Sequence, residues 1–174
     1  VRWAVQRYSK RMVQLMKLCG IKPEVRGRER LPPAPFILAP KHSSYGDGFL
    51  MYVQFDELAF VTGDHLERFP LVPKVLEKLG AIVIDNCGGP EAREHKRFRA
   101  GVWHMQEASQ WPVVPVATSL GLRWQQQDYA KYPGPAVIEF LDPIAPGLGK
   151  DEFLEQLGGA IRSNTDRLIA EGRE

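Results

Sequence analysis

A histidine and an aspartate at the end of an apolar stretch are the residues best suited to chemistry. Residues 36–39 are apolar, His42 follows in a polar turn, and Asp47 comes five residues later. A neutral imidazole can take the proton of an alcohol that attacks a carbonyl carbon. A carboxylate beside the other ring nitrogen fixes the tautomer and stabilises the imidazolium that forms. The pair is therefore suited to acyl transfer to a hydroxyl group, with His42 as base and Asp47 as its orienting partner.

The same residues also have a plainer interpretation. Asp47 stands where the next helix should begin and could be its N-cap, while His42 could be an exposed turn residue. Positions five apart do not share a helix face, so the two side chains meet only if residues 43–46 bend, which Gly46 makes easier. Ser43 and Ser44 lie inside this turn and are our candidates for substrate contacts.

The elements that must position the pair alternate between extended and helical patterns. Strands are predicted at 36–39, 58–62, 81–84, 113–118 and 136–141, and helices at 47–54, 72–79, 99–110 and 151–170. This alternation predicts an α/β layer fold in which helices cover a partly parallel sheet.

Residues 1–19 form a separate amphipathic pattern. Their apolar side chains follow one stripe at helical spacing, and Gly20 is a plausible helix end. Residues 1–22 contain no acid and carry the bases Arg2, Arg7, Lys10, Arg11, Lys17 and Lys22. Such a helix can pack on its own domain, lie in the headgroup layer of an anionic membrane, or do both. We predict a membrane-associated helix at 1–22 and a second domain at 23–174.

Composition excludes several classes of protein. The 174 residues are 44% apolar, which fits a folded domain, and a net charge of +2 is too small to favour nucleic acid. No apolar run approaches the ~20 residues that cross a bilayer. We expect no signal peptide, although a segment could precede Val1. Two distant cysteines and four scattered histidines predict neither a disulfide framework nor a metal site.

Further motifs follow His42 and Asp47 in a recognisable order. They are Gly80-Ala-Ile-Val-Ile-Asp85-Asn86, Val113-Val-Pro115-Val, and a late strand that ends at Pro143-Ile. With the H-x4-D turn, they make nearly the whole chain resemble the lysophosphatidate acyltransferase family, the 1-acylglycerol-3-phosphate acyltransferases and related lysolipid acyltransferases.

The resemblance implies a fold and an activity. The fold would be the glycerolipid acyltransferase α/β domain, with an N-terminal helical part at the membrane surface, on the cytoplasmic face. The activity would be transfer of a fatty acyl group from acyl-CoA or acyl carrier protein to a lysophospholipid, without a cofactor. Pro115 would shape a strand end that lines the acyl site, although a proline in this position also fits an edge strand.

Two departures from the family pattern concern the phosphate site. Asn86 stands where the family has arginine, and the block F-P-E-G-T-R is absent. Its arginine would offer a fork of donors to the acceptor's phosphate. Because the flanks resemble the two sides of a longer family segment, we predict that a segment is missing between about Asn86 and Phe98. Lys96, Arg97 and Arg99 would then lie at the edge of the phosphate site.

Other functions remain as alternatives. A catalytically degenerate module that binds lipid at the membrane surface would explain the absent block. A second acyltransferase group, marked by H-H-x3-D-G, has histidine where Ser43 stands here. A serine hydrolase would need the G-x-S-x-G elbow, which none of the serines has. Nucleic-acid binding is weaker still, because the N-terminal bases lie beside methionine, leucine and valine rather than exposed aromatic residues.

Overall fold

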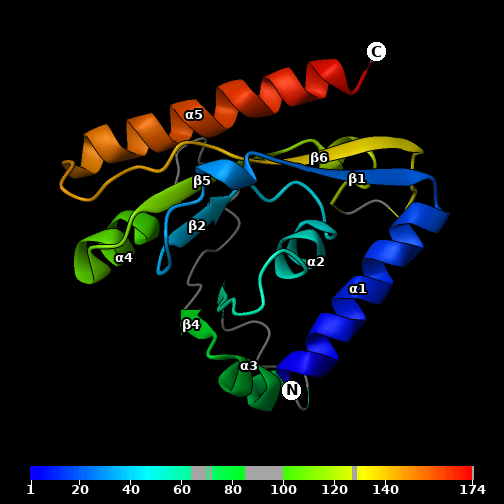
Figure 1. Ribbon diagram of the computed structural model, residues 1–174, viewed down its shortest axis with the longest axis horizontal. Coiled ribbons are helices and arrows are strands. Elements are labelled where there is room, and N and C mark those ends of the chain that lie inside the picture. The colour runs from blue at the N-terminus through cyan, green and yellow to red at the C-terminus, as the bar shows by residue number, and fades with distance from the viewer. Residues whose placement is uncertain (64–69, 71, 85–99, 127–128, 174) are drawn as a thin grey trace. The chain divides into compact units, whose positions relative to one another are not determined.

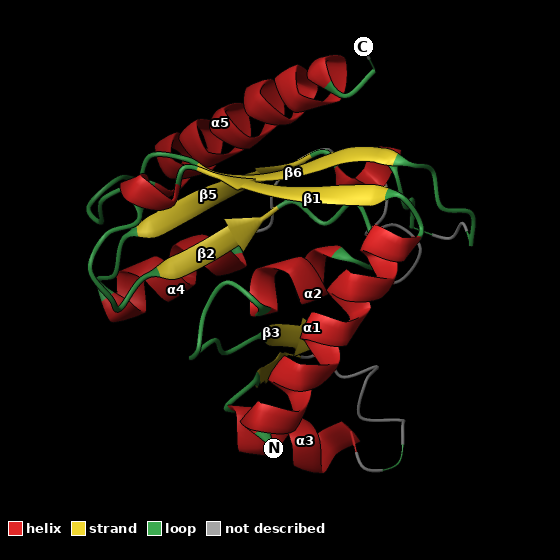
Figure 2. Cartoon of the chain, turned by 45° about the vertical axis from the view of Figure 1, so that its right-hand side comes forward, coloured by secondary structure: helices red, strands yellow, loops and turns green. Residues whose placement is uncertain are grey.

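The computed structural model describes residues 1–63, 70, 72–84, 100–126 and 129–173 (Figures 1 and 2). In chain order the elements are α1 (Arg2–Leu18), β1 (Ile21–Arg26), η1 (Arg28–Arg30), β2 (Ile37–Pro40), α2 (Asp47–Tyr52), β3 (Val61–Gly63), α3 (Val72–Leu79), β4 (Ile82–Ile84), α4 (Gly101–Ser109), β5 (Val113–Thr118), η4 (Leu120–Leu122), β6 (Gly134–Phe140) and α5 (Lys150–Glu171).

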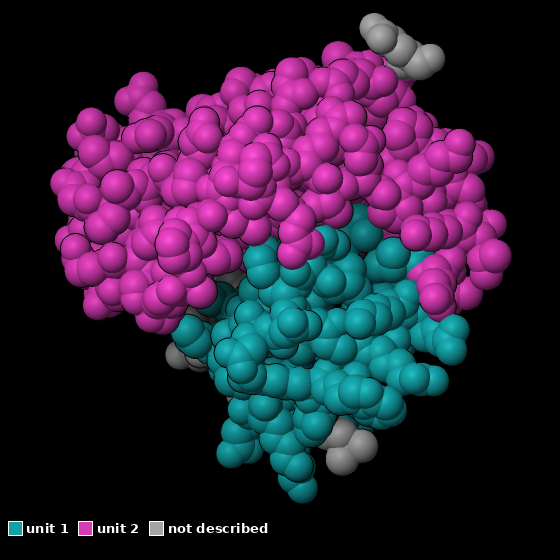
Figure 3. All heavy atoms as spheres, in the orientation of Figure 1, with its two compact units in different colours: residues 1–13, 48–96 teal, residues 14–47, 97–174 magenta. Residues whose placement is uncertain are grey.

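The contacts divide the chain into two compact units, which Figure 3 shows in different colours. Unit 1 comprises residues 1–13 and 48–96, and unit 2 comprises residues 14–47 and 97–174. The boundary that we predicted between residues 22 and 23 falls inside β1, a strand of unit 2.

Unit 2 is built on a four-stranded mixed sheet with the order β1-β6-β5-β2. β1 runs parallel to β6, β2 runs parallel to β5, and β5 and β6 are antiparallel. Every residue of β5 is buried, as expected for a strand covered on both faces. The sheet confirms the predicted α/β class with a mixed, partly parallel sheet covered by helices.

Helix α5 lies along one face of this sheet (Figures 1 and 2). Phe153, Leu157 and Ile161 recur at helical spacing and pack with Val113 of β5 and Ile37 of β2. Two acidic residues in the first turn of α5 favour its start, because they face the positive end of the helix dipole. This packing makes the sheet the rigid base on which the turn after β2 is held.

Unit 1 pairs β3 with β4 in parallel and includes the first part of α1. The Gln6 side-chain amide donates to the carbonyl oxygens of Tyr52 and Phe55, at 3.0 and 2.6 Å. Tyr8 meets Phe49 edge to face, with ring centroids 5.6 Å apart. These contacts tie α1 to the end of α2 within this unit.

The helix expected over residues 1–19 is present as α1. Its apolar side chains are only partly covered: Met16 is buried, whereas Tyr8 and Leu15 expose 57% and 52% of their surface. Leu18 exposes 83%. Among the described residues, no helix combines the length and apolar character that crossing a membrane requires.

Two features of the sheet differ from expectation. Sequence reasoning missed β1, whose residues Ile21–Arg26 include a proline and three charges; an edge strand that pairs on one side tolerates both. The edge-strand interpretation of Pro115 is wrong, because β5 lies between β2 and β6. The paired register of β6 with β5 begins at Val116, one residue beyond the proline.

Candidate functional site

The turn that carries His42 hangs from the end of β2. The Lys41 N–H donates to the carbonyl oxygen of Val116 at 3.2 Å, which fixes the chain just before the turn. His42 itself is exposed. A strand end that presents an accessible imidazole is a suitable position for a base that must meet a substrate hydroxyl.

Asp47 holds this turn together from inside. Its side chain is buried, and Oδ2 accepts the backbone N–H groups of Ser43 and Ser44 at 2.6 and 2.8 Å. Oδ1 accepts the hydroxyl of Thr118 at 3.4 Å, a long contact near the limit for a hydrogen bond. Asp47 is the first residue of α2, but its carboxylate reaches back to the preceding turn. The structure therefore does not show the Asp47 side chain as the N-cap of α2.

Burial sets the protonation of this carboxylate. Loss of hydration raises the pKa of Asp47 above its ordinary value of 3.8. The hydrogen bonds from Ser43 and Ser44, the charge of His42 and the Thr118 hydroxyl all act in the opposite direction without cancelling that effect. Burial thus disfavours the ionised form of this carboxylate, and perturbations of this kind are common at functional sites.

His42 and Asp47 interact through charge rather than through a described hydrogen bond. The His42 charge lowers the pKa of Asp47, so the two groups are near enough to couple. Among the hydrogen bonds of the described residues, none joins the imidazole to the carboxylate. The catalytic roles of His42 and Asp47 therefore stay a prediction. In the structure, Asp47 anchors the turn by hydrogen bonds and interacts with the imidazole through charge.

Ser43 and Ser44 contribute to the turn in different ways. The Ser44 side chain is buried, and its Oγ accepts the N–H of Gly46 at 3.0 Å. The Oγ of Ser43 is also buried but has no hydrogen-bond partner among the described residues. Both residues bind Asp47 through their backbone, and their predicted contact with substrate stays a prediction.

The remaining predicted site residues are not brought to this turn by the described structure. Lys96, Arg97 and Arg99, with the predicted gap between residues 86 and 98, lie outside the described residues. Pro115 is buried in β5, two residues from Val113 and Ala117, whose side chains pack with α5. Strand alternation places it on the α5 face.

Thr118 is a site residue that sequence reasoning missed. It follows Ala117 and therefore points to the face of β5 opposite α5. Its 71-residue separation from Asp47 left no local signal in the sequence. The sequence shows only that the predicted strand 113–118 ends in a hydroxyl residue.

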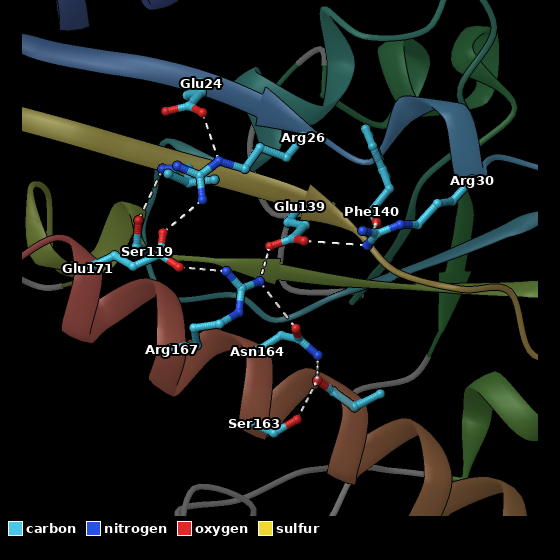
Figure 4. Close-up of polar contacts among 12 residues, drawn as sticks. Glu24, Arg26, Arg30, Ser119, Glu139, Phe140, Ser163, Asn164, Arg167 and Glu171 are labelled. Atoms are coloured by element: carbon cyan, nitrogen blue, oxygen red, sulfur yellow. Dashed lines mark hydrogen bonds and ion pairs between the residues drawn. The ribbon is translucent and has the colours of Figure 1, made fainter.

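The α5 face carries a separate polar cluster, shown in Figure 4. Glu139 of β6 is buried, and it accepts hydrogen bonds from Arg30 of η1 and Arg167 of α5. Glu171 then links Arg167 to Arg26 of β1. The hydrogen bond that Arg167 donates to Glu139 raises the pKa of Arg167, and the bond that Arg26 donates to Glu171 lowers the pKa of Glu171.

A cavity of about 680 Å³ opens beside this cluster. Its polar lining includes Arg30, Glu139, Asp142, Asn164 and Arg167. Because Glu139 pairs with Ala117 in the sheet, the cavity lies on the α5 face and not on the face of Thr118. Its arginines are engaged by carboxylates, so we interpret the cluster as a structural tie between β1, β6 and α5.

The described residues also bear on metal binding. They contain no group of three or more His, Cys, Asp or Glu side chains arranged to hold a metal ion. The turn itself offers an exposed imidazole, a buried carboxylate and nearby hydroxyl groups.

The fold and site are those of an α/β domain with a mixed sheet and an exposed histidine in an aspartate-anchored turn. Residues 22–93 match the family model described as Acyltransferase. A 1-acyl-sn-glycerol-3-phosphate acyltransferase of Pseudomonas aeruginosa is 26% identical over 163 residues, which cover 76% of this chain and 63% of the relative. These matches confirm the predicted resemblance to the acyltransferase family, and the chain spans less than two thirds of that relative's length.

A solved structure shares the fold. The 1-acyl-sn-glycerophosphate (LPA) acyltransferase PlsC from Thermotoga maritima superposes with a TM-score of 0.74 at 16% identity, covering 98% of this chain and 80% of that one. The alignment with the Pseudomonas protein extends over 163 residues but covers 76% of this chain, so part of that relative has no counterpart here. The segment predicted to be missing within 86–98 stays a prediction.

Proposed function

We propose that the chain is an O-acyltransferase of the membrane surface. It moves a fatty acyl group from acyl-CoA or acyl-ACP to the free hydroxyl of a lysophospholipid such as 1-acylglycerol-3-phosphate, in membrane lipid synthesis. The observation that carries the proposal is the exposed His42 on a turn anchored by the buried Asp47. The name of the Pseudomonas relative supports the choice of acceptor.

The proposed reaction needs only these groups and its two substrates. One ring nitrogen of His42 takes the hydroxyl proton as the acceptor oxygen attacks the thioester carbonyl. A C–O bond forms, the C–S bond breaks, and the leaving thiolate takes the proton back from the imidazolium. The products are an ester and a thiol, and His42 is neutral again. The thioester is already activated, so the proposal requires neither metal nor cofactor.

Helix α1 supports a position at the membrane, which we place on the cytoplasmic face. Trp3, Tyr8, Leu15 and Leu18 expose apolar surface on a helix without acidic residues. Aromatic rings favour the headgroup layer, and each base near anionic lipid adds about 1 kcal/mol of attraction. The acceptor is itself a lipid, so an enzyme held at the surface meets it there.

A degenerate lipid-binding module is the second candidate, favoured by the absent F-P-E-G-T-R block. The two proposals differ in the consequence of His42→Ala. We expect an enzyme to lose roughly 10²- to 10⁴-fold in rate, the usual contribution of a general base. His104→Ala, at another exposed histidine on α4, is the matched control and should keep full activity.

The experiment uses anionic vesicles containing 1-acylglycerol-3-phosphate, with acyl-CoA and acyl-ACP supplied in separate reactions. Vesicle binding is measured in parallel by sedimentation. Loss of transfer in His42→Ala with unchanged sedimentation supports the enzyme. Absence of transfer with either donor in the unaltered protein, alongside normal vesicle binding, would favour the lipid-binding module.

A further inference from the structure

The segment that follows β5 packs directly against the turn of His42. Thr118, the last residue of β5, is buried, and its Oγ1 accepts the N–H of Leu120 at 3.1 Å. A hydroxyl has one hydrogen to donate, and this arrangement leaves it for Asp47 Oδ1, 3.4 Å away. Leu120 thereby orients the hydroxyl of Thr118 toward the carboxylate that anchors the turn.

Gly121 lies close to the same turn, next to Ser43. A Cβ atom at Gly121 would sit 2.9 Å from the Cβ of Ser43 and 3.1 Å from its carbonyl oxygen. Real Cβ atoms essentially never approach so closely, and the carbonyl belongs to a backbone that Asp47 already holds. Any side chain at position 121 would have to push the turn away.

Gly46, at the other end of the turn, has the same kind of neighbours. Its hypothetical Cβ would lie 2.9 Å from Leu120 and 3.1 Å from Trp124. Trp124 in turn has the Lys131 ammonium 4.4 Å from its ring centroid. The segment 118–124 therefore meets the turn at its first serine, its glycine and its aspartate.

We infer that Thr118 and Gly121 are positioning residues for His42, acting through Asp47 and Ser43. The inference rests on the proposed acyl transfer. A shift of about 1 Å in a reacting group can cost 10²-fold in rate, so a turn without internal regular structure needs such external support. Neither residue has to touch a substrate for this role.

The effect on rate should come with an effect on pH dependence. The Thr118 hydroxyl is among the groups that lower the pKa of Asp47 against the effect of burial. Without that hydroxyl the pKa of Asp47 rises further. Since the mechanism uses ionised Asp47, the fall in activity on the acidic side should begin at a higher pH.

The test is Thr118→Val, which keeps the shape and removes the hydroxyl, against Thr118→Ser, which restores it. We expect about a tenfold loss of kcat in the valine variant, the low end for a hydrogen bond to a charged group. KM for both substrates should stay unchanged, and serine should recover most of the rate. Thr165→Val is the matched control, because Thr165 is also buried, in α5, and its hydroxyl has no hydrogen-bond partner in the described part of the chain.

Gly121→Ala tests the steric half independently. It should lower kcat while Gly159→Ala, in α5 where an added Cβ meets nothing within 4 Å, does not. His42→Ala is measured beside them. If that variant keeps its rate, the proposed function fails. If it loses its rate while Thr118→Val and Gly121→Ala both retain full kcat and the unaltered pH profile, the positioning role is overturned.

Thermal unfolding of each variant separates positioning from a general loss of structure. The inference is supported if Thr118→Val melts like the unaltered protein but has a lower kcat and loses activity at a higher pH on the acidic side. Thr118→Ser should then recover most of the rate. A loss of rate that serine does not recover, or that Thr165→Val reproduces, refutes it.

Discussion

Replacing Asp47 by asparagine should separate the structural from the chemical task of this residue. The asparagine oxygen can accept the N–H groups of Ser43 and Ser44 as Oδ2 now does. Its amide would face Thr118, whose hydroxyl can also accept. The turn should therefore keep its shape while the buried charge disappears.

The expected change in stability follows from two opposing terms. A hydrogen bond to a charged group contributes about 1.5–3 kcal/mol and a neutral one about 0.5–1.5, so two short bonds together lose roughly 2–3 kcal/mol. Removing a buried charge recovers a desolvation penalty of several kcal/mol. Because the pKa of Asp47 is raised, burial outweighs the bonds. We expect Asp47→Asn to be neutral or more stable at neutral pH.

The pH dependence carries a definite sign. With a raised pKa, folded Asp47 binds a proton more readily than the unfolded chain does. Its contribution to the free energy of unfolding is favourable below the unfolded pKa, and it is lost as pH rises through the folded pKa. The asparagine variant lacks this term. Its stability relative to the unaltered protein should thus rise with pH across that window and level off above it.

Denaturant unfolding at several pH values and initial rates of acyl transfer are the two assays. We expect kcat to fall about 10²- to 10³-fold, less than the 10⁴-fold known where aspartate bonds the ring directly. An asparagine variant that is less stable by more than about 2 kcal/mol at neutral pH, with the deficit shrinking in acid, would falsify the burial argument. Full activity in a stable variant would refute the electrostatic role.

Two further predictions concern other parts of the chain. Glu139→Gln should lower the free energy of unfolding by about 1–3 kcal/mol, because it leaves Arg30 and Arg167 without their shared carboxylate, though both are partly hydrated. Denaturant unfolding measures this loss, activity should persist, and Glu155→Gln, at an exposed site on α5 beyond its first turn, should change neither. On α1, Leu18→Glu should reduce sedimentation with anionic vesicles, whereas Ala170→Glu, an equal charge change at an exposed site on α5, should not. Equal binding by both variants would argue against α1 as the lipid contact.

Elements with a strong pattern could be predicted from the sequence. Helix α3 and strand β5 occupy the expected residues, and α5 extends the expected range by one residue at each end. Apolar spacing and buried runs decide such elements locally. β1 escaped because its residues are mixed in character, and only pairing with β6 makes them a strand. Long-range pairing of that kind leaves little trace in one sequence.

The sequence places His42 and Asp47 in one turn, but their roles stay a prediction and the geometry of the turn could not be foreseen. The spacing of His42 and Asp47 indicated a base and its partner. It did not indicate that the carboxylate would bind the backbone of its own turn, since that depends on the bend of residues 43–46. Thr118 and Gly121 could not be foreseen, because their contacts with the turn arise only when β5 is placed beside β2.

The two oxygens of Asp47 are unequally engaged, and this asymmetry bears on how the base is oriented. Oδ2 accepts two short bonds from the turn, whereas the one contact of Oδ1 with the described residues is the long one with Thr118. A carboxylate offers about four acceptor positions, so Oδ1 keeps capacity for a further donor. The imidazole of His42, whose charge already acts on Asp47, can be that donor, and catalytic hydrogen bonds commonly tighten only when substrate is bound. We therefore expect the backbone of the turn to hold Asp47 permanently and the imidazole to reach Oδ1 when the acceptor hydroxyl arrives.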